Sequence, residues 1–248
     1  MSETHLQVFP TMSVLSAAAA DLFARSAREA VAGRKRFLAA LSGGGTPVPL
    51  FKLLALPPYR EELPWTKMHF FWSDERCVPP GNPESNYGQA RANWLARVAV
   101  PEDNLHRIKG ELPPEQAAED YRALLKGFAE AGLDWPRLDL VLLGLGADGH
   151  TASLFPGSLV KPGPEMAAVP VQANYAGRPA ERVSLTASVI NAARLVLFLV
   201  TGEEKAEALA ATRQGRSDPA RWPAQRIRPS DGKVLWMIDA AAGSLLSS

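Results

Sequence analysis

Short apolar segments of strand length recur along this 248-residue chain, and longer segments rich in Ala, Leu, Glu and Arg separate them. This alternation is typical of α/β folds, in which helices connect the strands of a parallel sheet. The predicted strands are 7–9, 36–41, 67–72, 138–143, 194–200 and 234–238, with weaker candidates at Ile108 and Val169. The predicted helices are 13–31, 47–54, 87–98, 114–131, 187–192 and 203–211.

The segment 138–143 is apolar except for Asp139. A strand that is covered by helices on both faces needs a nearly continuous apolar run, so this segment is the predicted central strand. The pattern as a whole predicts an α/β fold with a doubly wound, mostly parallel sheet and helices on both faces. We expect residues 1–248 to form one domain.

The charge balance and the cysteine count exclude several classes of protein. The chain has 27 Lys and Arg against 26 Asp and Glu, so it has no overall positive field for nucleic acid or an anionic membrane. Cys77 is the single cysteine, which excludes an intramolecular disulfide and a thiolate metal site within one chain. The apolar run 17–20 is interrupted by Asp21 before it reaches the length of a signal peptide or membrane span. We therefore expect a cytoplasmic protein that binds neither nucleic acid nor membrane.

A glycine-rich turn, 42–47, lies between a predicted strand and a predicted helix. Glycines let backbone N–H groups approach a ligand closely, and the start of a helix attracts anions. Thr46 is a suitable N-cap and Pro47 a suitable first helical residue. The turn predicts a phosphate site that includes Ser42, Gly43, Gly44 and Thr46, although a tight turn without a ligand has the same composition. The Gly-Lys-Ser/Thr of nucleotide triphosphatases is missing.

A second glycine-rich segment follows the predicted central strand. Gly144, Gly146 and Gly149 match the GxGxxG pattern of dinucleotide-binding proteins, but Pro156 ends the expected helix too early for that class. The same segment carries Asp148 and His150. An imidazole at a strand end can accept a proton from water, and a neighbouring carboxylate can hold its tautomer. His150 is therefore a candidate general base, with a structural histidine as the alternative.

Charged residues also follow other strands. Asp74 and Arg76 lie in a predicted turn directly after the strand 67–72, Arg182 precedes a strand or turn at 183–186, and Lys205 lies at a helix start. Arginine clamps phosphate with two hydrogen bonds, and a carboxylate orients a sugar hydroxyl or an arginine. A solvated group of ion pairs is the alternative interpretation.

Together the segments 42–47, 73–76, 85–88, 144–157 and 201–206 resemble the motif series of the 6-phosphogluconolactonase family, over nearly the whole chain. LGLGADGHTASLFPG is the most specific of these, because related glucosamine-6-phosphate deaminases continue differently after Asp-Gly-His. The resemblance implies a Rossmann-like fold and hydrolysis of 6-phospho-D-glucono-1,5-lactone in the pentose phosphate pathway, with no metal and no organic cofactor. By position it implies that His150 is the base, that Asp148 is its partner, and that the phosphate and sugar contacts come from Ser42, Gly43, Gly44, Arg76, Arg182 and Lys205. Thr46 and Asp74 complete the expected substrate-binding set.

A lactone of this kind is an activated ester, so general-base attack of water suffices and no covalent intermediate is needed. The chain also lacks the GxSxG motif of serine esterases. Two other functions fit the same residues. One is a sugar-phosphate isomerase or deaminase in which Asp74 moves protons, and the other is a non-catalytic module that senses sugar phosphates. In each case the expected partner is a small sugar phosphate, and the protein is expected to be a monomer or a small homo-oligomer.

Overall fold

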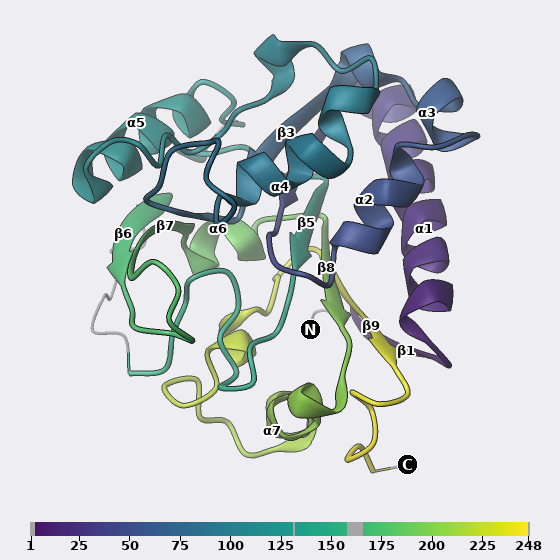
Figure 1. The fold of residues 1–248 in the computed structure, drawn as a ribbon, viewed down its shortest axis with the longest axis vertical. Helices are drawn as coiled ribbons and strands as arrows, with labels where there is room; N and C mark the ends of the chain where they lie inside the picture. The colour runs from purple at the N-terminus through teal and green to yellow at the C-terminus, as the bar shows by residue number, and fades with distance from the viewer. Residues whose placement is uncertain (1–2, 131, 158–165, 248) are drawn as a thin grey trace.

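The computed structural model describes residues 3–130, 132–157 and 166–247. Its centre is a six-stranded sheet in which every neighbouring pair of strands is parallel (Figure 1). The strand order is β1-β9-β8-β5-β2-β3. The strands are β1 (Glu3–Phe9), β2 (Phe37–Leu41), β3 (Met68–Trp72), β5 (Leu140–Leu143), β8 (Leu195–Val200) and β9 (Lys233–Asp239). The predicted fold class is confirmed, and each predicted main strand is present.

The order of the strands defines where the chain reverses its direction of winding. From β2 the chain moves outward to β3, then returns to β5 on the other side of β2 and continues outward to β8 and β9. The reversal therefore lies between β2 and β5. In sheets of this kind the connections after two such strands diverge and leave a crevice at their carboxyl ends.

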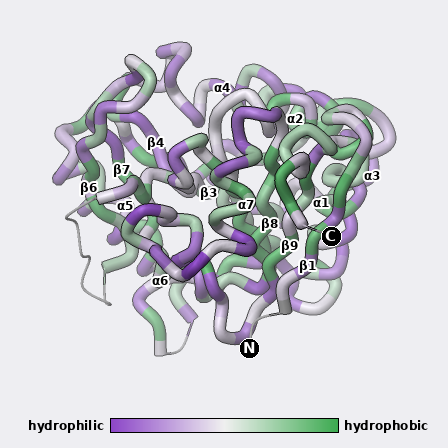
Figure 2. Tube along the Cα trace, turned by 90° about the horizontal axis from the view of Figure 1, so that it is seen from below, coloured by the Kyte–Doolittle hydropathy of each residue, from purple (hydrophilic) through white to green (hydrophobic). Residues whose placement is uncertain are grey.

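The helices are α1 (Met12–Arg34), α2 (Val48–Leu54), α3 (Tyr59–Glu62), α4 (Asn86–Asn93), α5 (Pro114–Lys126), α6 (Ala187–Asn191) and α7 (Ala206–Gln214). Short 3₁₀ turns lie at η1 (Trp65–Lys67), η2 (Leu95–Arg97), η3 (Glu102–Asn104), η4 (Glu203–Lys205) and η5 (Pro223–Arg226). Figure 2, seen along the strands from below, shows α1, α2 and α3 on one side of the large sheet and α6 on the other.

The longest helix, α1, shows how composition places a helix on this sheet. Its N-cap is Thr11, whose side-chain oxygen accepts a hydrogen bond from the Val14 N–H at 3.3 Å. The buried face consists mostly of alanines together with Phe23. Small side chains let the helix lie close to β1, β9 and β2, while Phe23 packs edge-on against Phe37 at 5.4 Å between ring centroids.

A smaller antiparallel sheet lies beside the large one, in the order β4-β7-β6. Its strands are β4 (Asp74–Arg76), β6 (Ala168–Gln172) and β7 (Glu181–Leu185). The weak strand candidate at Val169 is thus a real strand, whereas β4 was interpreted as a turn and that interpretation is wrong. Three charged residues in succession do not resemble a buried strand, and here they are buried because side-chain partners compensate their charges.

Several further details differ from the prediction, among them the start of α7, which is Ala206 and not residue 203. Ile108 is buried but belongs to no strand, so that weak candidate is wrong. Helix α4 ends at Asn93, five residues before the predicted end, because Trp94 has an extended φ of −149°. Helix α5 ends at Lys126, and Ala131, where that helix was predicted to end, lies outside the described residues.

Two histidines pack together on the outer side of the edge strand β3. His69 Nδ1 lies 3.1 Å from His106 Nε2, and the two rings stack at 5.3 Å between centroids. Phe71 and Phe128 cover the His106 ring. Burial, and secondarily the positive charge of Arg36, lowers the pKa of His69, and burial with the neighbouring His69 lowers the pKa of His106 to about 4.

We predict that this pair makes the protein sensitive to mild acid. Both pKa values are lower in the folded chain than in the unfolded chain, so the unfolded chain binds more protons below pH 6.5. Stability is then lost as the pH falls from about 6.5 towards 4, by at most about 2 kcal/mol at pH 5 for His106 alone, because solvent screens this partly exposed ring. Denaturant unfolding of the wild type and His106→Gln at pH 7 and pH 5 measures this. Equal losses of unfolding free energy in the two proteins would contradict it.

Candidate functional site

A cavity of about 310 Å³ opens at the carboxyl ends of the strands around the reversal point. It is lined by the turns that follow β2 and β5, by β4 and β7, and by Lys205 beyond β8. The structure brings nine of the predicted site residues to this one cavity, namely Ser42, Gly43, Gly44, Thr46, Asp74, Arg76, His150, Arg182 and Lys205. The tenth, Asp148, contacts His150 without lining the cavity.

His150 is held by a carboxylate two residues before it in the chain. Its Nδ1 lies 2.6 Å from Asp148 Oδ1, and the same oxygen accepts the His150 backbone N–H at 3.1 Å. Burial alone would raise the pKa of Asp148, but these hydrogen bonds and the attraction of His150 outweigh it and lower that pKa. An ionised carboxylate only accepts hydrogen bonds, so Nδ1 carries the proton and Nε2 has a free lone pair. Nε2 makes no hydrogen bond within the described parts of the chain.

The imidazole ring is also held by two aromatic rings. Phe155 stacks on it at 4.4 Å between centroids, and Tyr175 meets it edge-on at 4.6 Å. The His150 side chain is 15% exposed, so it is neither buried in hydrocarbon nor directed into bulk solvent. With its orientation set on three sides, the ring presents one nitrogen to the cavity.

Glycines make this arrangement possible. A Cβ on Gly146 would lie 2.1 Å from His150 Nδ1 and 2.5 Å from Asp148 Oδ1. Gly149 has a φ of +81°, and a Cβ there would lie 2.5 Å from the Trp222 ring. No helix begins after Gly149 within the described residues 150–157, so the dinucleotide interpretation of GxGxxG lacks the helix start that it requires. These glycines position a histidine.

The turn that follows β2 exposes a row of backbone donors to the cavity. The N–H groups of residues 43–46 donate no hydrogen bond to the described residues. Gly44 has a φ of +90°, a conformation that side chains disfavour. The predicted cap is one residue too early: Pro47 is the N-cap, α2 begins at Val48, and the Thr46 hydroxyl lies 3.5 Å from that of Thr201 instead.

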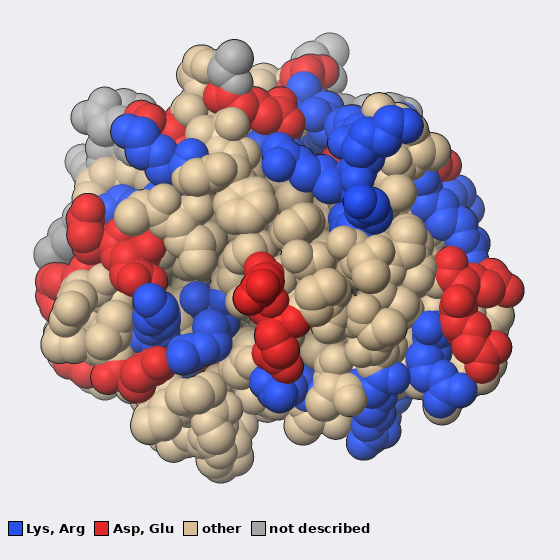
Figure 3. Space-filling model, turned by 90° about the horizontal axis from the view of Figure 1, so that it is seen from above, with Lys and Arg blue, Asp and Glu red and all other residues tan. Residues whose placement is uncertain are grey.

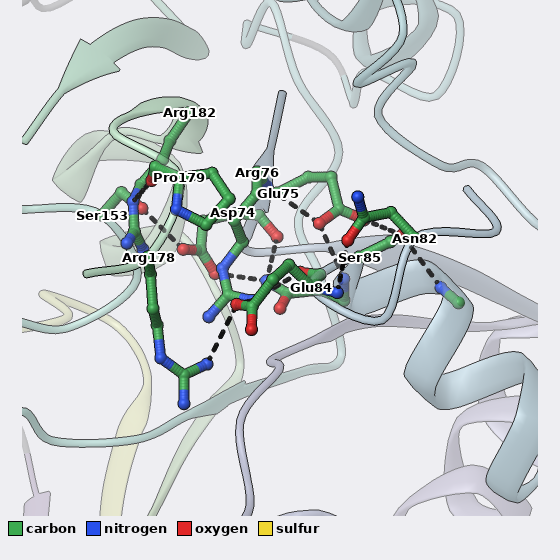
Figure 4. Close-up of polar contacts among 12 residues, drawn as sticks. Asp74, Glu75, Arg76, Asn82, Glu84, Ser85, Ser153, Arg178, Pro179 and Arg182 are labelled. Atoms are coloured by element: carbon green, nitrogen blue, oxygen red, sulfur yellow. Dashed lines mark hydrogen bonds and ion pairs between the residues drawn. The ribbon is translucent and has the colours of Figure 1, made fainter. Parts of the chain in front are cut away.

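Asn86 links this turn to β4. Its Nδ2 donates to Asp74 O at 2.8 Å and to Asp74 Oδ1 at 3.2 Å. Its Oδ1 is buried with no hydrogen-bond partner and lies where a Cβ of Gly43 would be, 1.8 Å from that position. Asp74 also accepts the Ser153 hydroxyl at 2.6 Å, so both carboxylate oxygens are occupied (Figure 4).

Glu75 anchors the loop that carries Asn86. Its buried carboxylate accepts the backbone N–H groups of Arg76, Asn86 and Tyr87 at 2.7–2.8 Å and the Ser85 hydroxyl at 2.9 Å. Burial raises the pKa of Glu75 in spite of these four donors. The same carboxylate lies at the start of α4, where the free N–H groups of a helix favour an anion. The sequence analysis did not select Glu75.

Two buried arginines face each other across β4 and β7. Arg76 and Arg182 are opposite in the strand register and are 6% and 3% exposed. Arg76 Nη1 donates to Glu84 O and Oε2, and Arg182 Nε donates to Pro179 O at 3.2 Å (Figure 4). Arg76 Nε and Arg182 Nη2 are buried without a partner. Burial lowers the pKa of Arg182, Asp74 opposes this, and Arg76 adds to it. Such under-neutralised guanidinium groups favour an anionic ligand.

Lys205 adds a further cation. It is the last residue of the turn η4 and the N-cap of α7, and it makes no ion pair within the described residues. The sequence offers Glu203 and Glu204 as compensating anions, but neither forms an ion pair with Lys205 among the described residues, and the Glu204 carboxylate folds back against Gly202, where a Cβ would lie 2.3 Å from Oε2. The Lys205 ammonium therefore lines the cavity without an acidic partner.

Sequence analysis missed the hairpin between β6 and β7. Two successive left-handed residues, Ala176 (φ 51°) and Gly177 (φ 67°), turn the chain, and Tyr175 and Arg178 beside them line the cavity. Arg178 Nη1 lies 3.3 Å from Glu84 Oε2. An Asn-Gly pair would have signalled this turn, but an alanine in its first position conceals it.

The described residues contain no group of three or more His, Cys, Asp or Glu side chains that is arranged to hold a metal ion. None of the described helices has the length and apolar character needed to cross a membrane.

Comparisons with known proteins agree on one family. Residues 10–236 match the family model described as glucosamine-6-phosphate isomerases/6-phosphogluconolactonase. A 6-phosphogluconolactonase of Nostoc sp. is 40% identical over 98% of both chains, and one of Synechocystis sp. is 43% identical over 88% of both. The solved 6-phosphogluconolactonase of Trypanosoma brucei is 28% identical, with a TM-score of 0.87 over 100% of both chains. A monomeric glucosamine-6-phosphate deaminase has a TM-score of 0.83 at 21% identity over 98% of this chain and 100% of that one, a likeness of fold alone.

We predict that Gly43→Ala displaces Asn86 and breaks its hydrogen bonds to Asp74. The added methyl group overlaps Asn86 Oδ1, so the free energy of unfolding falls by about 1–3 kcal/mol. Gly45→Ala is the matched control, because a Cβ there meets no atom within 4 Å and its φ is not positive. Denaturant unfolding of both variants checks this. Equal stability of the two would contradict the close approach.

Proposed function

The chain belongs to the glucosamine-6-phosphate isomerase/6-phosphogluconolactonase family, and we propose that it hydrolyses 6-phospho-D-glucono-1,5-lactone to 6-phosphogluconate, a step of the oxidative pentose phosphate pathway. The observation that carries this proposal is the free Nε2 of His150, held by Asp148 in a cavity whose cations outnumber its anions. Curated relatives that cover nearly the whole chain bear the name of this enzyme.

His150 acts as the general base of the proposed reaction. Nε2 takes a proton from a water molecule as the water oxygen bonds to C1 of the lactone, and Asp148 stabilises the imidazolium that forms. The carbonyl oxygen becomes an oxyanion, for which backbone N–H groups of the glycine-rich turns after β2 and β5 are candidate donors. The bond between C1 and the ring oxygen then breaks, and the imidazolium returns the proton to that oxygen as the C5 hydroxyl. The chemistry requires no metal or organic cofactor, because the ring ester is already activated.

The phosphate of the substrate holds the lactone in place. Arg76, Arg178, Arg182 and Lys205 line the cavity, and Asp74 is the one carboxylate among its described lining residues. A phosphate dianion compensates the buried guanidinium nitrogens that have no partner. Ser42, Gly43, Gly44 and Thr46 supply further polar contacts to phosphate and sugar. Anchoring at a distance from C1 lets binding energy orient the reacting carbonyl.

The isomerase or deaminase alternative has less support. It needs Asp74 to move protons, yet both oxygens of Asp74 already accept hydrogen bonds, from Ser153 and Asn86. A protein that only senses sugar phosphates would need no oriented base, whereas His150 is oriented by Asp148 and two aromatic rings. Ammonia release from glucosamine 6-phosphate, measured beside acid release from the lactone, separates the first alternative from lactone hydrolysis.

We also propose the domain organisation, cellular location and partners that the sequence predicts. The chain is a single domain over residues 1–248 that acts in the cytoplasm on a small sugar phosphate, as a monomer or small homo-oligomer, and binds neither nucleic acid nor membrane. The near balance of charge and the small volume of the cavity, about 310 Å³, support this proposal.

We predict that His150→Ala lowers kcat about 10²- to 10⁴-fold without loss of the fold, because it removes the positioned base. Asp148→Asn keeps the side-chain shape but no longer fixes the Nδ1–H tautomer, so kcat also falls while KM changes little. Acid release from freshly prepared lactone, measured promptly because the lactone also opens unaided, gives both constants. Turnover of His150→Ala close to that of the wild type would rule out His150 as the base.

We predict that Arg76→Ala and Lys205→Ala act mainly on KM. Each loses a charged hydrogen bond to phosphate, which costs about 1.5–3 kcal/mol and corresponds to roughly a 10- to 100-fold rise in KM. Lys52→Ala is the control, because Lys52 is an exposed cation on α2 that does not line the cavity. Unchanged KM in both variants would place the phosphate elsewhere.

A further inference from the structure

A second cavity, also of about 310 Å³, lies at the opposite edge of the same sheet. It is formed at the amino ends of β2, β5 and β8, whose carboxyl ends border the first cavity. Six residue steps separate Arg36 from Ser42 along β2, so the two cavities are about 20 Å apart along the strands. The lining residues are Arg34, Arg36, Leu38, Glu130, Arg137, Asp139 and Arg194. We call this group the arginine cavity.

Asp139 is the structural centre of the arginine cavity. Its side chain is 5% exposed, and its Oδ2 accepts the Leu38 backbone N–H at 2.9 Å, which ties β5 to β2. Its Oδ1 receives Arg34 Nη2 at 2.7 Å and lies 3.4 Å from Arg194 Nε. Two guanidinium groups thus share one oxygen, and Arg194 Nε remains buried without a hydrogen bond.

The remaining cations leave the arginine cavity with an excess of positive charge. Four arginines face two carboxylates, Glu130 and Asp139, among the residues that line it. Arg137 is partly compensated by Asp231 at 2.9 Å, on the exterior. Arg36 has no acidic partner among the described residues and only lies 6.0 Å from the centroid of the Phe128 ring. Figure 3, seen from above, shows Lys and Arg side chains gathered in a dense group on this end of the molecule.

From this arrangement we propose that the arginine cavity binds a small anion of the phosphate class with at least two negative charges. Guanidinium groups match phosphate oxygens with paired hydrogen bonds. Arg36 and Arg194 Nε have unused donors, and the volume suits a small molecule rather than a macromolecular segment. The anion supplies the negative charge that two carboxylates, Asp139 shared by two arginines and Glu130 paired with Arg194 at 3.3 Å, leave lacking among four arginines. This site is separate from the lactone site and does not depend on the proposed function.

Calorimetric titration with inorganic pyrophosphate tests the site, with three variants beside the wild type. Arg36→Gln removes the cation that has no acidic partner, so it breaks no ion pair and the fold is retained. Arg76→Gln/Lys205→Gln weakens anion binding in the first cavity. Lys35→Gln is the matched control, because it removes a neighbouring positive charge that does not line the arginine cavity.

We expect the same pyrophosphate affinity at the arginine cavity in the wild type, in Lys35→Gln and in Arg76→Gln/Lys205→Gln. In Arg36→Gln we expect this affinity to fall about tenfold or more. Lactone hydrolysis by Arg36→Gln without pyrophosphate should equal that of the wild type. The proposal is overturned if Arg36→Gln binds as the wild type does, if Lys35→Gln loses as much affinity as Arg36→Gln, or if binding disappears only in Arg76→Gln/Lys205→Gln.

Discussion

The constraint on which this structure depends is the complete burial of its central strands. β2, β5 and β8 are nearly all apolar and covered on both faces. Because an unpaired buried charge is costly, charged side chains on these elements lie only at the strand ends. The polar chemistry of the chain is therefore concentrated at two edges. At the carboxyl ends of the strands, the reversal of winding between β2 and β5 opens a crevice. At their amino ends, the Asp139 carboxylate pairs with two arginines, Arg34 and Arg194.

Both ends of the strands carry cations that need negatively charged or polar partners, and the cations around the first cavity are only partly paired. Around the first cavity, backbone and side-chain donors are paired with Asp74, Glu75 and Glu84 until two guanidinium nitrogens and Lys205 remain unmatched. A ligand anion completes the pairing, so binding energy is already directed at the phosphate before any chemistry occurs. The general base, His150, takes no part in these ion pairs and hydrogen bonds. His150 is held by Asp148 and aromatic rings, which fix the orientation of its ring and leave Nε2 without a hydrogen-bond partner among the described residues.

Much of this was predictable from local patterns, and the failures have physical causes. The parallel strands are predictable because their burial demands apolar runs, and His150 is predictable because it lies in a glycine turn that follows the predicted central strand. β4 is not predictable in this way, because its charged residues are buried only through long-range contacts such as Ser153 with Asp74 and Arg182 with Arg76. Glu75 and Asn86 were missed for the same reason. Both residues form hydrogen bonds with groups that folding brings close to them, and the periodicity of the sequence gives no indication of such contacts.

The position of β9 also determines when the sheet can be finished. β1 pairs only with β9 in the large sheet, and β9 lies between β1 and β8 although it is formed by residues near the end of the chain. During synthesis on the ribosome β1 therefore has no neighbour in the large sheet to bond with until the residues of β9 have been added. A nascent chain keeps β1 unpaired while residues 10–232 are synthesised, and during that interval a chaperone has a single extended segment to protect.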